Sequence, residues 1–314
     1  MKFLVILICL TINYLWLKDF DRFDDAWFFR LRRRVELALS ENSGRADFAW
    51  IVPVVFIYAL PLLALGLILF AVNGMAFGLP TMLVHILVLL VVFDRTQPGR
   101  LASEFLTRWR KGDVEGSVLY MRQERLASSD AALESQAQIA AFFKRKFIYR
   151  CFEKMFVVFF WYLLTGALGV LFSYVSYQMR DSHEDGQDAR QVNLICRITY
   201  ILEWMPMRLL ALTFSLAGNF VQCFEKVKLS FWEFQPETDS GAALFSYAGC
   251  ALSGLTVAVS DSEDPQDLSE LSVEEQERLI EANEIEAIQA LLERSQAIWL
   301  GILALMTIFG LQVI

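Results

Sequence analysis

Residues 50–72 form an apolar run without a single charged residue, and this run constrains the fold more than any other feature of the chain. A helix rises about 1.5 Å per residue, so the run can cross a hydrocarbon core about 30 Å thick. A backbone inside a bilayer must satisfy its own hydrogen bonds, so the run is predicted to be helical although it contains Pro53 and Pro61. The chain is therefore expected to lie in a membrane.

Other apolar runs extend this pattern. Hydrophobic residues make up 56% of the 314 residues, the mean hydropathy is +0.42, and the apolar residues fall into blocks rather than periodic stripes. A turn at 73–74 predicts a returning helix over 77–93, and further spans are predicted over 155–178 and 297–314. Residues 3–17 lack a small-x-small cleavage site and predict a retained, short or tilted helix. The predicted class is all-α: a multi-pass helical membrane protein with four to five transmembrane helices and helical extramembrane segments.

The order of these runs divides the chain into five regions. They are an N-terminal membrane region with a basic segment and a helical hairpin (1–93), a basic helical cytoplasmic loop (94–154), a transmembrane span (155–178), a polar-core region with an acidic helix (179–296) and a C-terminal span (297–314).

Lysine and arginine predict the orientation. They crowd residues 22–34 and 144–154, and an even number of predicted crossings separates these segments. Because basic residues favour the cytoplasmic side of a membrane, both segments are predicted to face the cytoplasm. The region 179–296 is then expected outside, unless the run at 200–220 or the run at 241–259 also crosses.

The basic loop carries helix signals. Leu101, Phe105 and Trp109 recur at helical spacing, and Gly112 follows them as a C-cap. Residues 117–149 contain no glycine and predict ordered helix packed near the membrane surface.

A second soluble helix is predicted near the C-terminus. Ser272 and Glu275 form a capping box, so a helix should run from Val273 towards the C-terminal span. Its apolar face is expected to contain Ile285, Ile288 and Leu292. Its many glutamates favour a solvated helix face over a metal or amine site.

Motifs of catalysis are absent from the sequence. There is no Walker A run, G-x-G-x-x-G, G-x-S-x-G, H-E-x-x-H or C-x-x-C motif. His85 lies in a predicted span, where a hydrogen bond to a neighbouring helix is the default and a proton relay the alternative. His183 is expected to be solvated, and the five scattered cysteines favour reduced or buried thiols. No catalytic residue, metal ligand or cofactor is predicted, and the motifs lean against an enzyme of any common class.

A polar core interrupts the apolar run that begins at Glu203. The candidate binding residues of this core are Arg197, Glu203, Trp204, Arg208 and Asn219. Hydrocarbon makes each charge cost several kcal/mol, so these charges need a partner, a cavity or a headgroup. Two interpretations stay open. Glu203 and Arg208 form an internal ion pair with Pro206 bending the chain between them, or Arg208 offers its planar donor fork to an anion or headgroup.

Two blocks of sequence resemble a known family. Trp204-Met-Pro206-Met-Arg208-Leu-Leu-Ala-Leu is similar to the (D/N)W-x-P-x-R-L-x-A-L core of the AmpE/CbiB (CobD) family of bacterial inner-membrane proteins. Residues 156–174 resemble the family's PLFW-x-L-L-G-x-x-G-A-L-x-Y span, and the two blocks occur in the family's order. CbiB-type enzymes, which join an aminopropanol unit to a corrinoid carboxylate, carry an E-N-x-x-D-G run where this chain has Arg150-Cys-Phe-Glu153-Lys. Their early H-P motif is also missing here.

The resemblance to AmpE implies a multi-pass protein of the bacterial inner membrane. It implies a regulatory or accessory role in signalling for β-lactamase induction and cell-wall recycling, alongside a cytosolic amidase that processes cell-wall fragments. The expected partners are the lipid bilayer and either a cell-wall-derived ligand or a partner membrane protein, not nucleic acid. Two alternatives stay open: a diverged CbiB-like amide-forming enzyme, and a transporter of a small anion or muropeptide. A transporter should show two repeated halves, and the sequence contains no such repeat.

Overall fold

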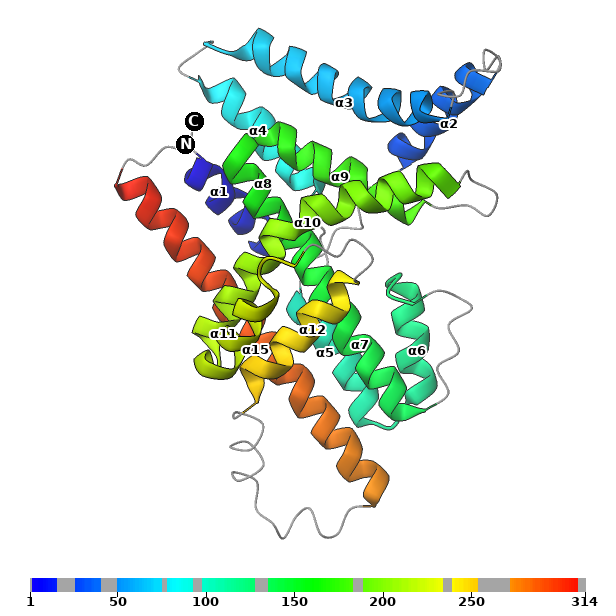
Figure 1. Cartoon of the computed structure of the whole chain (residues 1–314), viewed down its shortest axis with the longest axis vertical. Coiled ribbons are helices and arrows are strands. Elements are labelled where there is room, and N and C mark those ends of the chain that lie inside the picture. Colours follow the sequence, from blue (N-terminus) through cyan, green and yellow to red (C-terminus); the bar gives the residue numbers. More distant parts are fainter. Residues whose placement is uncertain are drawn as a thin grey trace. The chain divides into compact units, whose positions relative to one another are not determined.

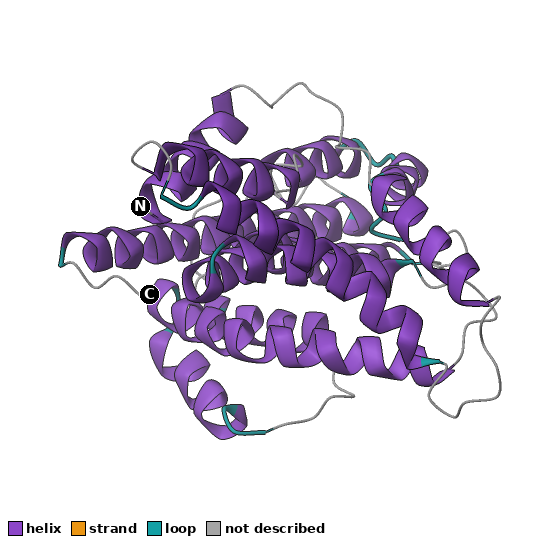
Figure 2. Cartoon of the chain, turned by 90° about the horizontal axis from the view of Figure 1, so that it is seen from above, coloured by secondary structure: helices purple, strands orange, loops and turns teal. Residues whose placement is uncertain are grey.

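The structure is a computed structural model. It describes residues 2–15, 26–40, 50–74, 78–92, 98–127, 135–182, 189–233, 239–253 and 272–309. Every regular element in these ranges is a helix, which confirms the predicted all-α class for the part of the chain described (Figure 2). The chain divides into two compact units: Met1–Arg95, Val157–Trp204 and Met306–Ile314 form the first, and Thr96–Phe156 and Met205–Leu305 form the second. These units cut across the five regions expected from the sequence.

The first unit consists mainly of apolar helices. They are α1 (Lys2–Leu15), α2 (Ala26–Ser40), α3 (Ile51–Val72), α4 (Leu79–Val92), α8 (Val158–Thr165), α9 (Ala167–Asp181) and the first part of α10 (Ala189–Ala217) (Figure 1). α3 and α4 pack against each other and against α9, and α4 also packs against α1. Gly74 follows α3 with φ +82°, a left-handed conformation that glycine adopts without strain. The turn predicted at residues 73–74 is therefore confirmed.

Two of the described helices are long and apolar enough to cross a membrane. They are α3 and α15 (Val273–Ile308). α4 is apolar but has 14 residues, which span only about 21 Å. By length and composition the described residues thus contain two candidate spans, and the predicted number of four to five is not confirmed. Leu63, Leu67 and Phe70 on α3 are exposed, and a large exposed apolar surface of this kind is typical of contact with lipid.

The prediction of one continuous span over 155–178 is wrong. The π-helix η2 (Phe152–Val157) leads into α8, which ends at Thr165, and α9 begins at Ala167. Between them Gly166 has φ +71° and ψ −149°, a conformation that residues with a Cβ atom avoid. The chain therefore changes direction at Gly166, and α9 packs against α8 instead of extending it.

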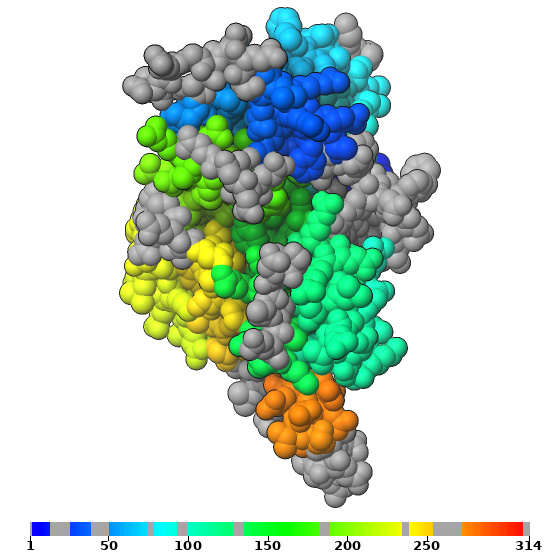
Figure 3. All heavy atoms as spheres, turned by 90° about the vertical axis from the view of Figure 1, so that its right-hand side faces the viewer, coloured from blue at the N-terminus to red at the C-terminus, as the bar shows by residue number. Residues whose placement is uncertain are grey.

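The second unit contains the predicted soluble helices. They are α5 (Pro98–Arg110), α6 (Val114–Gln123), α7 (Gln136–Cys151), most of η2, the last part of α10, α11 (Phe220–Ser230), α12 (Ser240–Leu252) and most of α15. α7 packs against α5, α6 and α12, and α12 packs against α11. Figure 3 shows α5 and α6 (blue-green) and α12 (gold) on one face of the molecule.

The predicted apolar face of α5 is confirmed. Leu101, Phe105 and Trp109 are all buried. Gly112 has φ +75°, and its backbone N–H donates to the carbonyl of Trp109 at 3.0 Å. The next N–H, that of Asp113, donates to the carbonyl of Arg108 at 3.1 Å, which completes a Schellman C-cap.

The predicted start and apolar face of α15 are also confirmed. The backbone N–H of Ser272 donates to Glu275 Oε2 at 2.9 Å, and the N–H of Glu275 donates to Ser272 Oγ at 3.3 Å, as in a capping box. Ile285, Ile288 and Leu292 are buried. The helix then continues without a break into its apolar end, as predicted.

The acidic first half of α15 contacts the basic loop. Trp109 Nε1 donates to the carbonyl of Arg278 at 3.2 Å, and Arg110 pairs with Glu286 at 2.7 Å. These contacts lie inside the second unit, so the start of α15 and the loop 94–154 lie on the same side of any membrane. The start of α15 therefore lies with the basic loop, as in the alternative in which the run at 200–220 or the run at 241–259 also crosses. Which side of a membrane the two segments face stays a prediction.

Cysteine labelling should show this shared side directly. Leu119 on α6 and Ile280 on α15 are both exposed, so either can be replaced by cysteine in a Cys196→Ser background. We expect both cysteines to resist a membrane-impermeant maleimide in intact cells and to react after permeabilisation. Labelling of one cysteine but not the other in intact cells would contradict the packing of α15 against the basic loop. Labelling of both would reverse only the orientation.

Candidate functional site

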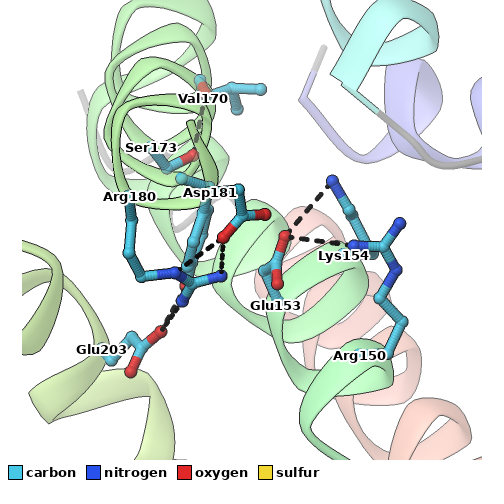
Figure 4. A network of polar contacts seen from close by, with 9 residues as sticks. Arg150, Glu153, Lys154, Val170, Ser173, Arg180, Asp181 and Glu203 are labelled. Carbon is cyan, nitrogen blue, oxygen red and sulfur yellow. Dashed lines mark hydrogen bonds and ion pairs between the residues drawn. The ribbon is translucent and has the colours of Figure 1, made fainter. Parts of the chain in front are cut away.

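Glu203 on α10 is a buried acid with partners on α9. Its side chain accepts a hydrogen bond from Tyr177 Oη at 3.0 Å, and Arg180 Nη1 lies 3.7 Å away (Figure 4). Arg180 also stacks over the Tyr177 ring at 4.9 Å and pairs with Asp181 at 2.7 Å. A buried carboxylate is stable only when it is paired and hydrogen-bonded, and the end of α9 supplies both kinds of contact.

Pro206 has a visible consequence one turn earlier on α10. A proline inside a helix has no N–H to donate to the carbonyl four residues before it, which here is the carbonyl of Leu202. Trp161 Nε1 on α8 donates to that carbonyl at 3.1 Å. The expected bend at Pro206 does not interrupt the helix, since α10 continues through it. Instead the missing N–H leaves an acceptor that holds α8.

Arg208 closes the end of a different helix. Its side chain is buried, with 4% exposed. Nε donates to the carbonyl of Phe231 at 2.5 Å, and Nη2 donates to the carbonyl of Glu233. Phe231 is the C-cap of α11, where carbonyls lack helical partners and a cation is favoured by the helix dipole. The planar fork of Arg208 therefore caps α11.

The other candidate residues have separate surroundings. The side chain of Asn219 caps α11 at its start by accepting from the N–H of Gln222 at 3.4 Å. Arg197 is exposed, and Trp204 is half-buried. Glu203 and Arg208 are both buried as expected, but the contacts described above give them different partners, which favours a structural role for each. Anion binding by this group stays a prediction.

Glu153 is a buried acid that the sequence analysis did not select. It lies in the π-helix η2 with 2% of its side chain exposed, 3.2 Å from Lys154 Nζ and 3.8 Å from Arg150 Nη1 (Figure 4). Single π-turns often occur at functional sites. The signal in the sequence was an acid at the position where CbiB-type enzymes carry their acidic run, but only the structure shows that it is buried.

The two histidines contribute differently. His85 Nδ1 lies 3.1 Å from Tyr162 Oη on α8, so the predicted hydrogen bond to a neighbouring helix is confirmed. His183 lies outside the described residues.

Comparison with models of protein families shows to which family the chain belongs. The family model described as "Regulatory signalling modulator protein AmpE" matches residues 5–238, about three quarters of the chain. The chain belongs to the AmpE family. The AmpE match includes both resembling blocks, and with them Trp161, Pro206 and Arg208, but ends before α15. An assignment to the CbiB (CobD) branch is not supported. No curated protein and no solved structure matched the chain in the other two comparisons.

The hydrogen bond from Trp161 to the carbonyl of Leu202 can be tested by a double-mutant cycle. Trp161→Phe removes the donor to the Leu202 carbonyl and should destabilise the protein by about 1–3 kcal/mol, the cost of an unsatisfied buried acceptor. In a Pro206→Ala background the helix regains its own N–H donor, so the same change should cost less. Thermal unfolding in detergent measures all four proteins. Equal costs in the two backgrounds would refute the link between Trp161 and Pro206.

Lys144 of the basic loop pairs with the acidic first half of α15, a helix that lies outside the AmpE match. This buried lysine lies 2.5 Å from Glu281 and 2.5 Å from Glu284. Burial disfavours its charged form, but hydrogen bonds and charge from the two glutamates outweigh burial, so the pKa of Lys144 lies above its usual value of 10.5. The glutamates of α15 that were expected to be a solvated face are thus in part paired.

This raised pKa predicts a loss of stability at alkaline pH. A lysine whose pKa is higher in the folded protein stabilises it fully below the unfolded pKa, and the stabilisation disappears as the pH rises through the folded pKa. We therefore expect the stability advantage of the parent protein over Lys144→Met to be constant at neutral pH and to shrink above the usual value of 10.5. Melting temperatures over this range measure it. The exposed Lys111→Met is the matched control and should leave the alkaline loss intact.

Proposed function

We propose that this chain is a multi-pass protein of the bacterial inner membrane that modulates signalling in β-lactamase induction and cell-wall recycling. The observation that carries the proposal is the AmpE family match over residues 5–238. The apolar helices α3 and α15 support a membrane location. In this proposal the chain lies in the lipid bilayer, and a cell-wall-derived ligand or a partner membrane protein supplies the signal.

The polar contacts favour this role over a diverged amide-forming enzyme. An amide ligase needs groups that hold an activated carboxylate and a base that deprotonates an amine. Here Arg208 donates to helix-end carbonyls, and Glu203 accepts from Tyr177 beside Arg180. The charges of the family core are thus engaged in holding α9 and α11, which suits a helical scaffold that changes arrangement in response to a signal.

Deletion of the chain from its host tests the proposal. Cells with and without the chain are exposed to a sub-inhibitory β-lactam, and β-lactamase activity is measured by hydrolysis of a chromogenic cephalosporin. We expect deletion to change the ratio of induced to basal activity several-fold, and the plasmid-borne chain to restore it. The Lys111→Met chain, altered at an exposed residue of the basic loop, should restore it equally well.

Fractionation of the same cells separates location from function. The proposal expects the chain in the inner-membrane fraction. An unchanged induction ratio, with the restored chain present in that fraction, would overturn the signalling role and leave the membrane location standing.

A further inference from the structure

One side of α2 holds this helix on the first unit. Phe28 and Arg32 are buried on that side, four residues apart. Trp27 stacks on Tyr174 of α9, with ring centroids 5.9 Å apart, and Arg32 Nη1 donates to the carbonyl of Ser182 at 2.7 Å. α2 also packs against α3. These contacts fix which side of α2 faces away from the unit.

The side that faces away carries three arginines. Arg30, Arg33 and Arg34 are all exposed, and their spacing of three and four residues places them together on one face of the helix. α2 contains a single acid, Glu36, which pairs with Arg32 at 2.8 Å. No acid among the described residues pairs with the three exposed arginines, although the whole chain has a net charge of −8. They form a local positive surface on an acidic protein.

Contacts within the unit place this surface at the start of α3. Tyr58 on α3 donates to Ser176 Oγ on α9 at 3.2 Å, and Gln191 at the start of α10 donates to the carbonyl of Trp50 at 2.7 Å. Arg32 binds just after the end of α9. Figure 1 shows the start of α3, the end of α9 and α2 at the same end of this unit. The arginines therefore lie at the level where an uncharged candidate spanning helix begins.

From this placement we propose that Arg30, Arg33 and Arg34 bind the phosphate groups of anionic phospholipids in the leaflet at which α3 begins. Lipid phosphates lie just outside the hydrocarbon core, at the level where a spanning helix begins. A guanidinium group presents a planar donor fork that matches two phosphate oxygens, and clustered basic residues beside a spanning helix attract anionic headgroups. This inference rests on the membrane location proposed above.

Quenching by spin-labelled lipid tests the inference on the full-length protein in phosphatidylcholine vesicles. A fluorophore is attached to Leu37→Cys, which is 60% exposed and lies one turn after Arg33 and Arg34, in a Cys196→Ser, Cys250→Ser background. The quenchers are phosphatidylglycerol and phosphatidylcholine that carry the same spin label on the acyl chain, near the headgroup. The ratio of quenching by the two lipids measures the local preference for the anionic headgroup.

Two triple variants separate the arginine surface from the net charge of the protein. The test variant combines Arg30→Gln, Arg33→Gln and Arg34→Gln, since glutamine has a similar helix propensity without the charge. The matched control makes the same change in net charge at three exposed residues of the second unit: Lys111→Gln, Arg122→Gln and Arg125→Gln.

We expect phosphatidylglycerol to quench the probe on α2 several-fold more than phosphatidylcholine does. The test variant should bring this ratio close to one, the control variant should keep it, and added salt should lower it because salt screens the attraction. Single changes at Arg33 or Arg34 should each lower the ratio in part, which keeps the test open if the triple variant does not fold. A probe at Leu63→Cys on α3 should be quenched equally by both lipids.

Three results would overturn the inference. One is quenching at Leu63→Cys together with a ratio near one at Leu37→Cys, which leaves the membrane location standing. Another is an equal loss in the two triple variants, which would show that net charge attracts the lipid. The third is a probe on α2 that is shielded from aqueous iodide but quenched by neither lipid, which would show that a protein covers the surface. Absence of quenching at Leu63→Cys would overturn the membrane location itself.

Discussion

Trp109→Ala should lower the free energy of unfolding of the second unit by about 3–5 kcal/mol, the range for removing a fully buried large aromatic side chain. Trp109 has no exposed surface, and its ring stacks on Phe105, with ring centroids 5.5 Å apart. Phe105 in turn stacks on Phe143 of α7 at 3.7 Å. The indole N–H adds a bond to the carbonyl of Arg278 on α15. The substitution therefore removes the side chain that joins the stack of Phe105 on Phe143 to α15.

Trp109→Phe separates packing from hydrogen bonding. It keeps an aromatic ring and removes the N–H, so its cost should be well below that of Trp109→Ala. Chemical denaturation of the purified protein in detergent, followed by circular dichroism, measures both. A loss of less than about 1 kcal/mol for Trp109→Ala would mean that α15 does not complete this core, because such a value is typical of surface positions.

Arg208→Ala should cost about 3 kcal/mol, because it removes two hydrogen bonds that a charged donor makes to the carbonyls at the end of α11. Arg208→Lys should recover only part of this, since an ammonium cannot reproduce the planar fork that reaches both carbonyls. Thermal unfolding in detergent and amide exchange at the end of α11 report the two aspects of the loss.

The matched control for Arg208 is on the same helix. Arg197→Ala removes an exposed arginine from α10 and should change stability by no more than about 0.5 kcal/mol. If Arg208→Ala were as mild as Arg197→Ala, and exchange at the end of α11 were unchanged, the capping role of Arg208 would be wrong.

Local signals in the sequence determined the helices and their ends. The spacing of Leu101, Phe105 and Trp109 predicted a buried helix face, and Gly112 predicted the cap that ends it. Ser272 and Glu275 likewise predicted where α15 begins. These features depend on residues within one or two turns of one another, so chain order alone contains the information. The two resembling blocks also lie in the family's order, and the AmpE match covers both.

Only the tertiary structure decided which partner each charge has. Lys144 meets Glu281 although 137 residues separate them, and Trp161 meets the carbonyl of Leu202 across 41 residues. Many acids and bases in this chain could have paired on grounds of charge alone, and burial and helix packing select among them. The sequence did not predict the break at Gly166 for a related reason. The apolar run is typical of one helix, and only the packing of α9 against α8 shows that the chain turns there. Composition and local pattern thus determined an all-helical, membrane-compatible chain, while the use of its buried charges depended on contacts that form only when distant segments pack.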